Sequence, residues 1–194
     1  MDIVENILDD DIKNALTVLK RGGLILYPTD TIWGIGCDAT NSKAIDDIYM
    51  LKQRAESKSL IILVADAEML KKYVRHVPST TADLMERYKR PLTIIYPEAV
   101  NLPKNLVPAS KTIAVRIPNH PFCTELLRQF QKPIVSTTAN ISGKASPSHY
   151  YEVDTVIKKG VDYVVNFERD NLSNASPSTI IRIHTNGDFE IIRE

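Results

Sequence analysis

Short apolar runs separated by amphipathic stretches dominate the chain, and this pattern predicts strands that alternate with helices. Runs with the length and composition of buried strands occur at residues 24–28, 60–64, 92–96, 112–117, 134–136, 161–166, 178–183 and 188–193. Apolar residues that recur every three or four positions predict helices beginning at Asp9 or Asp10, at Asn41 or Ser42, at Asp66, at Ser79 and near residue 121.

The order of these elements predicts the fold class. The strand at 60–64 is apolar on both faces and is expected at the centre of a sheet. The last strands follow one another directly through a turn at Asn186-Gly187, so the sheet is expected to be mixed and the fold α/β with flanking helices. Residues 97–111 and 137–148 are expected to be loops, the first on the surface. No repeat or linker divides the 194 residues, which predicts one domain spanning 1–194.

Composition and charge restrict the classes of function. Lys plus Arg number 24 and Asp plus Glu number 24, so the zero net charge argues against nucleic-acid binding through bulk charge, although a local basic patch stays open. Cys37 and Cys123 fit no metal-ligand spacing and are expected to be reduced thiols. The acidic N-terminus lacks the features of a signal peptide, and no apolar run approaches the roughly 20 residues that span a bilayer. We therefore expect a cytoplasmic protein with no membrane contact.

Several common catalytic motifs are missing. The chain has no G-x-x-x-x-G-K-[ST], which excludes a P-loop nucleotide site. Residues 34–39 match G-x-G-x-x-A, but the first glycine does not directly follow a predicted strand, so we interpret this match as a false positive. The histidines have no spacing for zinc or for a catalytic triad and are expected to be surface or loop residues: His76, His120, His149 and His184.

A polar segment and a basic cluster flank the second predicted helix. Pro28 ends the first strand and is followed by Thr29, Asp30 and Thr31, while Lys52, Arg54 and Lys58 follow the helix. Cations at a helix end are most often solvated and complement the helix dipole. Polar groups at the end of a strand, with cations a helix away, also suit the binding of an anion in a crevice.

Two further features allow both a structural and a functional interpretation. Arg116 falls in the middle of a strand on the face of Thr112 and Ala114, where a charge must be paired or must point into a wet cleft. The loop 136–148 is rich in hydroxyl groups and contains Gly143. Such a loop is either a solvated connection or an array of donors for phosphate oxygens.

Three groups of residues carry a resemblance to a known family. They are PTDTIWGIGCDA (28–39) followed by KQR (52–54), AVRIPNHP (114–121) with STTANISGKASPS (136–148), and PSTIIRI (177–183). In this order, and over nearly the whole chain, they resemble the YrdC family, the threonylcarbamoyl-AMP synthases that begin t6A modification of tRNA. The resemblance implies a twisted mixed sheet with an open, concave substrate cleft.

The resemblance also implies roles for the residues that match the family's motifs. Contacts to L-threonine fall on Thr31, Arg116, Ser136 and Ser178. Contacts to ATP fall on Arg54, Lys58, Thr93, Thr138, Asn140, Ser142, Ser146 and Arg193. Lys52 and Arg54 are the implied catalytic residues, which would stabilise the charge of the triphosphate.

The implied reaction joins L-threonine, bicarbonate and ATP into threonylcarbamoyl-AMP and releases pyrophosphate, so the expected class is a nucleotidyltransferase. Mg²⁺ is expected to enter with ATP, because the sequence shows no cluster of carboxylates for a metal site. The chain ends soon after its last predicted strand, so the extra C-terminal domain of longer members is not expected. The protein is therefore expected to rely on separate threonylcarbamoyl-transferase proteins, and contact with tRNA stays open.

Departures from the family pattern leave two alternatives. Leu63 stands where many members carry histidine, Tyr88-Lys89-Arg90 replaces a W-P-G sequence, and Thr138 replaces the serine of S-x-N. One alternative is a module that binds tRNA or double-stranded RNA, which salt-dependent RNA affinity without ATP turnover would favour. The other is a paralogue with a different acceptor specificity, which Leu63 keeps open.

Overall fold

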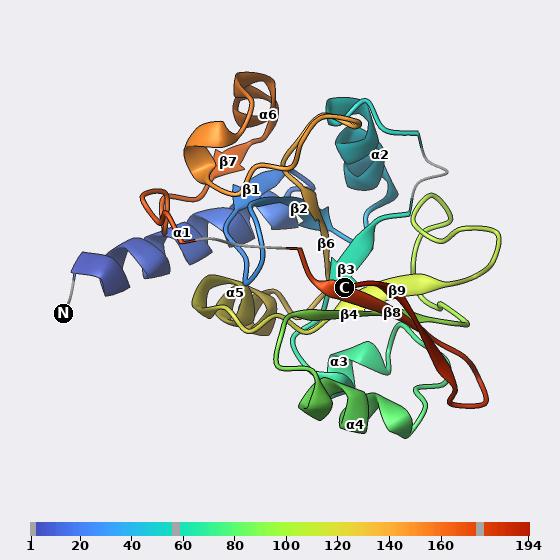
Figure 1. Ribbon diagram of the computed structural model, residues 1–194. Coiled ribbons are helices and arrows are strands. Elements are labelled where there is room, and N and C mark those ends of the chain that lie inside the picture. The colour runs from blue at the N-terminus through green and yellow to red at the C-terminus, as the bar shows by residue number, and fades with distance from the viewer. Residues whose placement is uncertain (1–2, 56–58, 174–176) are drawn as a thin grey trace.

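The computed structural model describes residues 3–55, 59–173 and 177–194, and within them nine strands form one mixed β-sheet (Figure 1). The strands are β1 (Ile25–Tyr27), β2 (Gly34–Asp38), β3 (Ile61–Leu63), β4 (Leu92–Tyr96), β5 (Ile113–Arg116), β6 (Ile134–Thr138), β7 (Tyr163–Val164), β8 (Thr179–Ile183) and β9 (Phe189–Arg193). Their order across the sheet is β7-β1-β2-β6-β3-β5-β4-β8-β9. The pairs β1–β7, β3–β5 and β4–β8 are parallel and the others antiparallel, which confirms the predicted mixed sheet and the central place of β3.

Helices cover both faces of this sheet. They are α1 (Ile3–Lys20), α2 (Ser42–Leu51), α3 (Ala67–Leu70), α4 (Thr80–Arg87), α5 (Pro121–Phe130) and α6 (Thr155–Gly160), with a 3₁₀ turn at Tyr150–Glu152. No helix in the described ranges is both long and apolar enough to cross a bilayer. The predicted start of α2 is confirmed, because the Asn41 side chain accepts a hydrogen bond from the Ala44 N–H and caps the helix.

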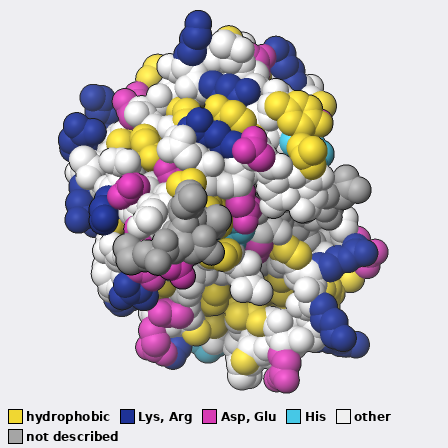
Figure 2. Space-filling view, turned by 90° about the vertical axis from the view of Figure 1, so that its left-hand side faces the viewer, with side chains coloured by type: hydrophobic (Ala, Val, Ile, Leu, Met, Phe, Trp, Pro, Cys, Tyr) yellow, Lys and Arg dark blue, Asp and Glu magenta, His cyan; other side chains and the backbone are white. Residues whose placement is uncertain are grey.

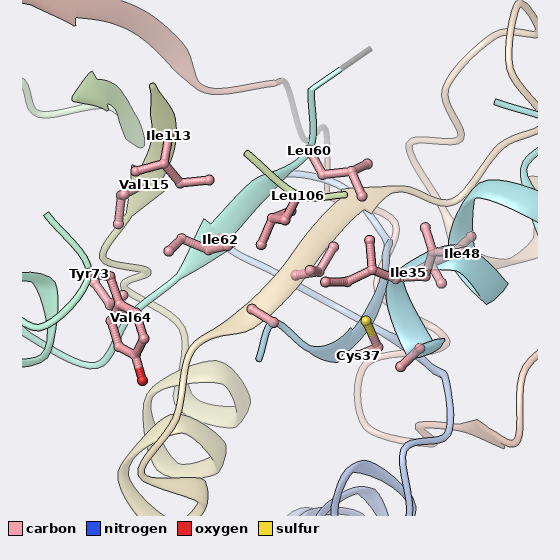
Figure 3. Close-up of a cluster of buried hydrophobic side chains, with 14 of the residues drawn as sticks. Ile35, Cys37, Ile48, Leu60, Ile62, Val64, Tyr73, Leu106, Ile113 and Val115 are labelled. Carbon is pink, nitrogen blue, oxygen red and sulfur yellow. The ribbon is translucent and has the colours of Figure 1, made fainter. Parts of the chain in front are cut away.

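The strand register separates an apolar face from a face that carries small and polar residues. One row across β2, β6, β3 and β5 consists of Gly36, Ser136, Ile61 and Ala114, and the next row consists of Cys37, Val135, Ile62 and Val115. Consecutive residues of a strand point to opposite faces, so the two rows lie on opposite sides of the sheet. The second row belongs to the larger apolar cluster, which packs under α2 (Figure 3).

The other face is only partly covered. At one end α1 and α5 pack on it through Ile25, Tyr27, Leu63 and Ile134. The remainder of this face, around Ser136 and Ile61, is left open to the cavity described below. Leu63 therefore lies inside an apolar cluster of this chain.

The predicted start of the first helix is wrong. Helix α1 already begins at Ile3, and Asp9 and Asp10 lie within it and do not cap its end. Asp11, which follows them in the same acidic run, is buried. Its carboxylate accepts hydrogen bonds from the backbone N–H groups of Asn166 (2.8 Å) and Phe167 (2.6 Å). Asp11 therefore makes a tertiary contact with a distant segment, whereas Asp9 and Asp10 are exposed.

The sequence pattern missed strand β2. Glycine disfavours strands because it offers no side chain to pack, and β2 contains Gly34 and Gly36. Here the absence of a side chain is required: a Cβ on Gly36 would lie 2.8 Å from Tyr27 Cε1 and 2.7 Å from the Val135 carbonyl oxygen. The Tyr27 ring occupies the space that a side chain at position 36 would fill.

The loop at 97–111 is not a purely surface segment. Leu106 is almost fully buried and joins the larger apolar cluster, so this loop covers part of the core. The short elements α6 and 150–152 were not predicted, and the strand expected at 161–166 shortens to β7. The turn at Asn186-Gly187 connects β8 and β9 as predicted.

Candidate active site

A cavity of about 110 Å³ opens on the partly covered face of the sheet. Its walls come from the segment between β1 and β2, from β3, β5 and β6, and from the two ends of the β8–β9 hairpin. The lining residues are Thr31, Ile32, Trp33, Gly34, Ile61, Arg116, Ser136, Thr137, Thr138, Ser146, Pro177, Ser178 and Arg193. All four predicted L-threonine contacts, Thr31, Arg116, Ser136 and Ser178, are among them.

Small residues keep this cavity open. Gly34 on β2 lies opposite Thr138 on β6, and a Cβ on Gly34 would lie 3.3 Å from the Ser136 hydroxyl oxygen. Trp33 forms part of the wall and packs against the Tyr150 ring at a centroid distance of 5.0 Å. The glycine therefore leaves the serine hydroxyl accessible, while the tryptophan limits the cavity on one side.

Arg116 is a buried cation beside the cavity, with 4% of its side chain exposed. Its Nη1 donates a hydrogen bond to Thr31 Oγ1 at 2.9 Å, and its Nε lies 3.6 Å from Asp30 Oδ1. Within the described ranges Nε has no hydrogen-bond partner. A planar guanidinium with donors to spare suits a carboxylate ligand. The structure thus combines the two interpretations of Arg116, an ion pair with Asp30 and a position in the wall of a cleft.

Ser178 is fixed from two sides. Its hydroxyl shares a hydrogen bond of 2.8 Å with the Thr93 hydroxyl, and its carbonyl oxygen accepts one of 2.8 Å from Arg193 Nη2. Thr93 is completely buried, and it is not among the described residues that line the cavity. Thr93 therefore supports Ser178 from below, whereas Arg193 reaches the cavity itself.

Of the basic cluster after α2, the two residues that the structure describes, Lys52 and Arg54, are not part of this cavity wall. Lys52 is buried, and Arg54 donates from Nη2 to the Ser59 carbonyl oxygen at 2.8 Å. Burial, with a smaller effect of Arg54, lowers the pKa of Lys52 to about 7, and burial also lowers the pKa of Arg54. Lys58, the third predicted cation, falls outside the described residues.

The loop after β6 divides the predicted nucleotide contacts into two groups. Thr138 and Ser146 line the cavity. Asn140 and Ser142 are not among the described lining residues: the Asn140 side-chain amide donates to the Lys144 carbonyl oxygen at 2.6 Å, and the Ser142 N–H donates to the Lys52 carbonyl oxygen at 2.8 Å. The second group therefore shapes the loop.

Sequence reasoning missed two residues near the site. Asp30 was noted only as part of a polar segment, although its place next to Thr31 was a usable signal. His120 was expected in a loop or on the surface; it lies in the loop before α5, as predicted, but it is not a surface residue. It is buried, and its Nε2 lies 3.2 Å from Glu168 Oε2. This contact joins residues 48 positions apart, so no local pattern could have shown it.

The described residues contain no group of three His, Cys, Asp or Glu side chains that could hold a metal ion. Both cysteines are buried and free, which confirms the expectation of two thiols, and burial raises the pKa of each. On the side of the molecule shown in Figure 2, basic and acidic side chains are interspersed.

Comparison with known proteins places the chain in a family. The family model of Sua5, YciO and YrdC, described as telomere recombination, matches residues 17–194. A threonylcarbamoyl-AMP synthase of Pseudoalteromonas translucida is 37% identical over 172 residues, which are 87% of this chain and 91% of that protein. A protein of the same name from Escherichia coli O1:K1 is 36% identical over 141 residues, which are 71% of this chain and 74% of that protein.

Solved structures share the fold. Sua5 of P. abyssi complexed with L-threonine superposes with a TM-score of 0.79 at 28% identity, covering 89% of this chain and 50% of that chain. This chain thus spans about half the length of that protein. YciO of E. coli gives a TM-score of 0.81 at 24% identity over 94% of this chain and 88% of that chain, a likeness of fold. The chain therefore belongs to the Sua5/YciO/YrdC family.

Proposed function

We propose that this protein is an L-threonylcarbamoyladenylate synthase, a nucleotidyltransferase that forms threonylcarbamoyl-AMP and pyrophosphate from L-threonine, bicarbonate and ATP. The observation that carries the proposal is the cavity in which buried Arg116 meets the hydroxyl groups of Thr31, Ser136 and Ser178. The name of the curated relatives and the threonine complex of P. abyssi Sua5 support it.

The amino acid binds at the Arg116 end of the cavity. The guanidinium pairs with the carboxylate of L-threonine, because a planar fork of donors matches two carboxylate oxygens. The hydroxyl groups of Ser136 and Ser178 then orient the substrate, and Thr93 and Arg193 hold Ser178 in place. Leu63 packs in an apolar cluster of the protein and makes no polar contribution here.

ATP binds towards the loop after β6. Thr138 and Ser146 offer hydroxyl donors at the cavity, and Arg193 adds a cation. Arg54 and Lys58 contribute positive charge to the triphosphate. Asp30 already pairs with Arg116, and the described part of the chain shows no three-residue metal cluster. The substrate is therefore MgATP, with Mg²⁺ held mainly by phosphate oxygens.

The chemistry needs positioning more than a protein nucleophile. The threonine amine and bicarbonate give a carbamate and water, and a carbamate oxygen then attacks the α-phosphorus while pyrophosphate leaves. Cations stabilise the charge on the departing pyrophosphate. The apolar walls, Ile61 and Trp33 among them, limit the access of water to the labile carbamate.

The product is a substrate for a separate step in which a threonylcarbamoyl-transferase protein modifies tRNA. We place this step, and the enzyme, in the cytoplasm. An RNA-binding module as the sole function is not favoured, because the charges in Figure 2 form a mixture of both signs on that side.

Pyrophosphate release from MgATP by the purified protein, with and without L-threonine and bicarbonate, tests the proposal. Release that requires both co-substrates and falls strongly in Arg54→Ala is expected. Release that is indifferent to L-threonine would instead indicate another acceptor. No release, together with tight RNA binding, would favour the binding module.

A further inference from the structure

Lys52 stands at the C-terminal end of α2, where the chain reverses direction. The N–H of Gln53 donates to the Met50 carbonyl oxygen (3.0 Å) and that of Arg54 to the Tyr49 carbonyl oxygen (2.9 Å), the hydrogen bonds of a Schellman motif. Gln53 takes the left-handed conformation that this motif requires, with φ of 49°. This turn sends the Lys52 and Arg54 side chains into different surroundings, and only Lys52 is almost fully buried, at 1% exposed.

The Lys52 ammonium is occupied by one loop. It donates to the carbonyl oxygen of Thr138, to that of Asn140 at 2.8 Å, and to Asn140 Oδ1 at 3.4 Å. An ammonium has three N–H donors, so these oxygens use its whole donor capacity. In return, the Lys52 carbonyl oxygen accepts from the Ser142 N–H at 2.8 Å.

The same loop brings hydroxyl groups to the cavity. The Thr138 hydroxyl donates to Asn140 Oδ1, and the Asn140 amide donates to the Lys144 carbonyl oxygen. Thr138 and, further along the loop, Ser146 line the cavity. Lys52 therefore contacts the residues that determine where these hydroxyl groups point, and it is not among the described residues that line the cavity.

Moving the ammonium to a phosphate would carry a cost. Carbonyl oxygens that lose a charged donor in a buried place are left unsatisfied, which is unfavourable. We propose that Lys52 is a positioning residue that holds residues 138–146 in the shape that receives the nucleotide and does not touch the phosphates. The inference rests on the proposed function for the identity of the nucleotide, but its first tests need no turnover.

Chemical labelling of lysine amines in the wild-type protein separates the two roles. In the ligand-free protein we expect Lys52 to react at least about tenfold more slowly than Lys43, an exposed lysine on the same helix, because opening the loop must precede reaction. Addition of MgATP should change the Lys52 rate little further. Fast labelling of Lys52 without nucleotide, and protection by MgATP, would mean a direct phosphate contact and would overturn the proposal.

A variant tests the same point through the loop. In ligand-free Lys52→Met we expect the backbone amides of Ala139, Ser142 and Lys144 to exchange hydrogen about tenfold faster or more, while those of β1 keep their wild-type rates. Lys52→Arg should restore part of the protection, and Lys43→Met is the matched control with wild-type exchange. ATP affinity should fall in Lys52→Met as a consequence.

Wild-type exchange in residues 138–146 of Lys52→Met, combined with a loss of ATP affinity, would refute the positioning role. If Lys52→Met does not fold, the labelling of the wild-type protein still decides between the two roles. Failure of the proposed function gives a different result. The wild-type protein would then show slow labelling of Lys52, as expected for a held loop, but no threonine-dependent release of pyrophosphate.

Discussion

Arg116→Met tests how the buried ion pair beside the cavity contributes to stability. Methionine retains an unbranched apolar side chain but removes the guanidinium. Asp30 Oδ1 would then lose the cation 3.6 Å away, and Asp30 Oδ2 would keep the hydrogen bond from the Asn119 N–H at 3.3 Å. The Thr31 hydroxyl would lose the donor at 2.9 Å but keep its bond to the Thr29 hydroxyl at 2.8 Å.

The magnitude follows from burial. The Arg116 and Asp30 side chains are 4% and 9% exposed, so the pair belongs to the buried class. Removing one partner of such a pair costs about 3–5 kcal/mol, because a charge is left buried and unpaired. The long separation and the remaining Asn119 contact favour the lower end, about 3 kcal/mol.

Urea unfolding at pH 7 measures this loss, and Arg182→Met is the matched control. Arg182 Nη1 lies only 2.7 Å from Glu190 Oε1, but these side chains are 43% and 49% exposed. An exposed pair contributes about 0–1 kcal/mol in spite of its short distance. Equal losses in the two variants would show that burial does not control the energy of these pairs.

A double-mutant cycle isolates the cause. If the unpaired carboxylate carries the cost, then Asp30→Asn in the Arg116→Met background should recover more than half of the lost stability. No recovery would refute the reasoning and assign the loss to packing. Arg116→Met should also abolish threonine-dependent pyrophosphate release, which is measured separately.

Three further predictions follow from the backbone and from Lys52. Gln53→Gly should raise the free energy of unfolding by about 0.5–1 kcal/mol, because glycine adopts the left-handed conformation without a steric penalty, and a loss of stability in urea would contradict this. Gly36→Ala should lower the free energy of unfolding by about 1–3 kcal/mol, since the added Cβ meets the Tyr27 ring. An unchanged free energy of unfolding would show that the ring moves aside freely. The pKa of Lys52 is lowered from 10.5 to about 7 in the folded protein. Between pH 7 and pH 10.5 the unfolded chain therefore binds a proton at Lys52 that the folded protein does not bind, and the free energy of unfolding rises with pH. Between pH 7 and pH 9 the wild-type protein should therefore gain about 2 kcal/mol over Lys52→Met in urea unfolding, and parallel curves would argue against a lowered pKa.

The sequence alone determined the features that depend on local spacing. The bounds of β4 and the cap of α2 follow from apolar periodicity and side-chain chemistry within a few residues. The motifs that contain Thr31, Arg116, Ser136 and Ser178 were also visible, and these residues all line one cavity. Their identity could be predicted because each motif is a short, continuous stretch.

The tertiary structure decided what depends on contacts between distant residues. Strand β2 needs glycine at position 36 because the Tyr27 ring fills the space there, and local strand propensities do not describe such a contact. The same applies to the direction of Lys52, for which the resemblance implied a positive field at the triphosphate and whose ammonium donates to the loop after β6. Side chains become buried and paired only when segments far apart in the chain meet. The tertiary structure therefore decides how these side chains are oriented and how much their interactions contribute to stability, although the sequence already shows which side chains are present.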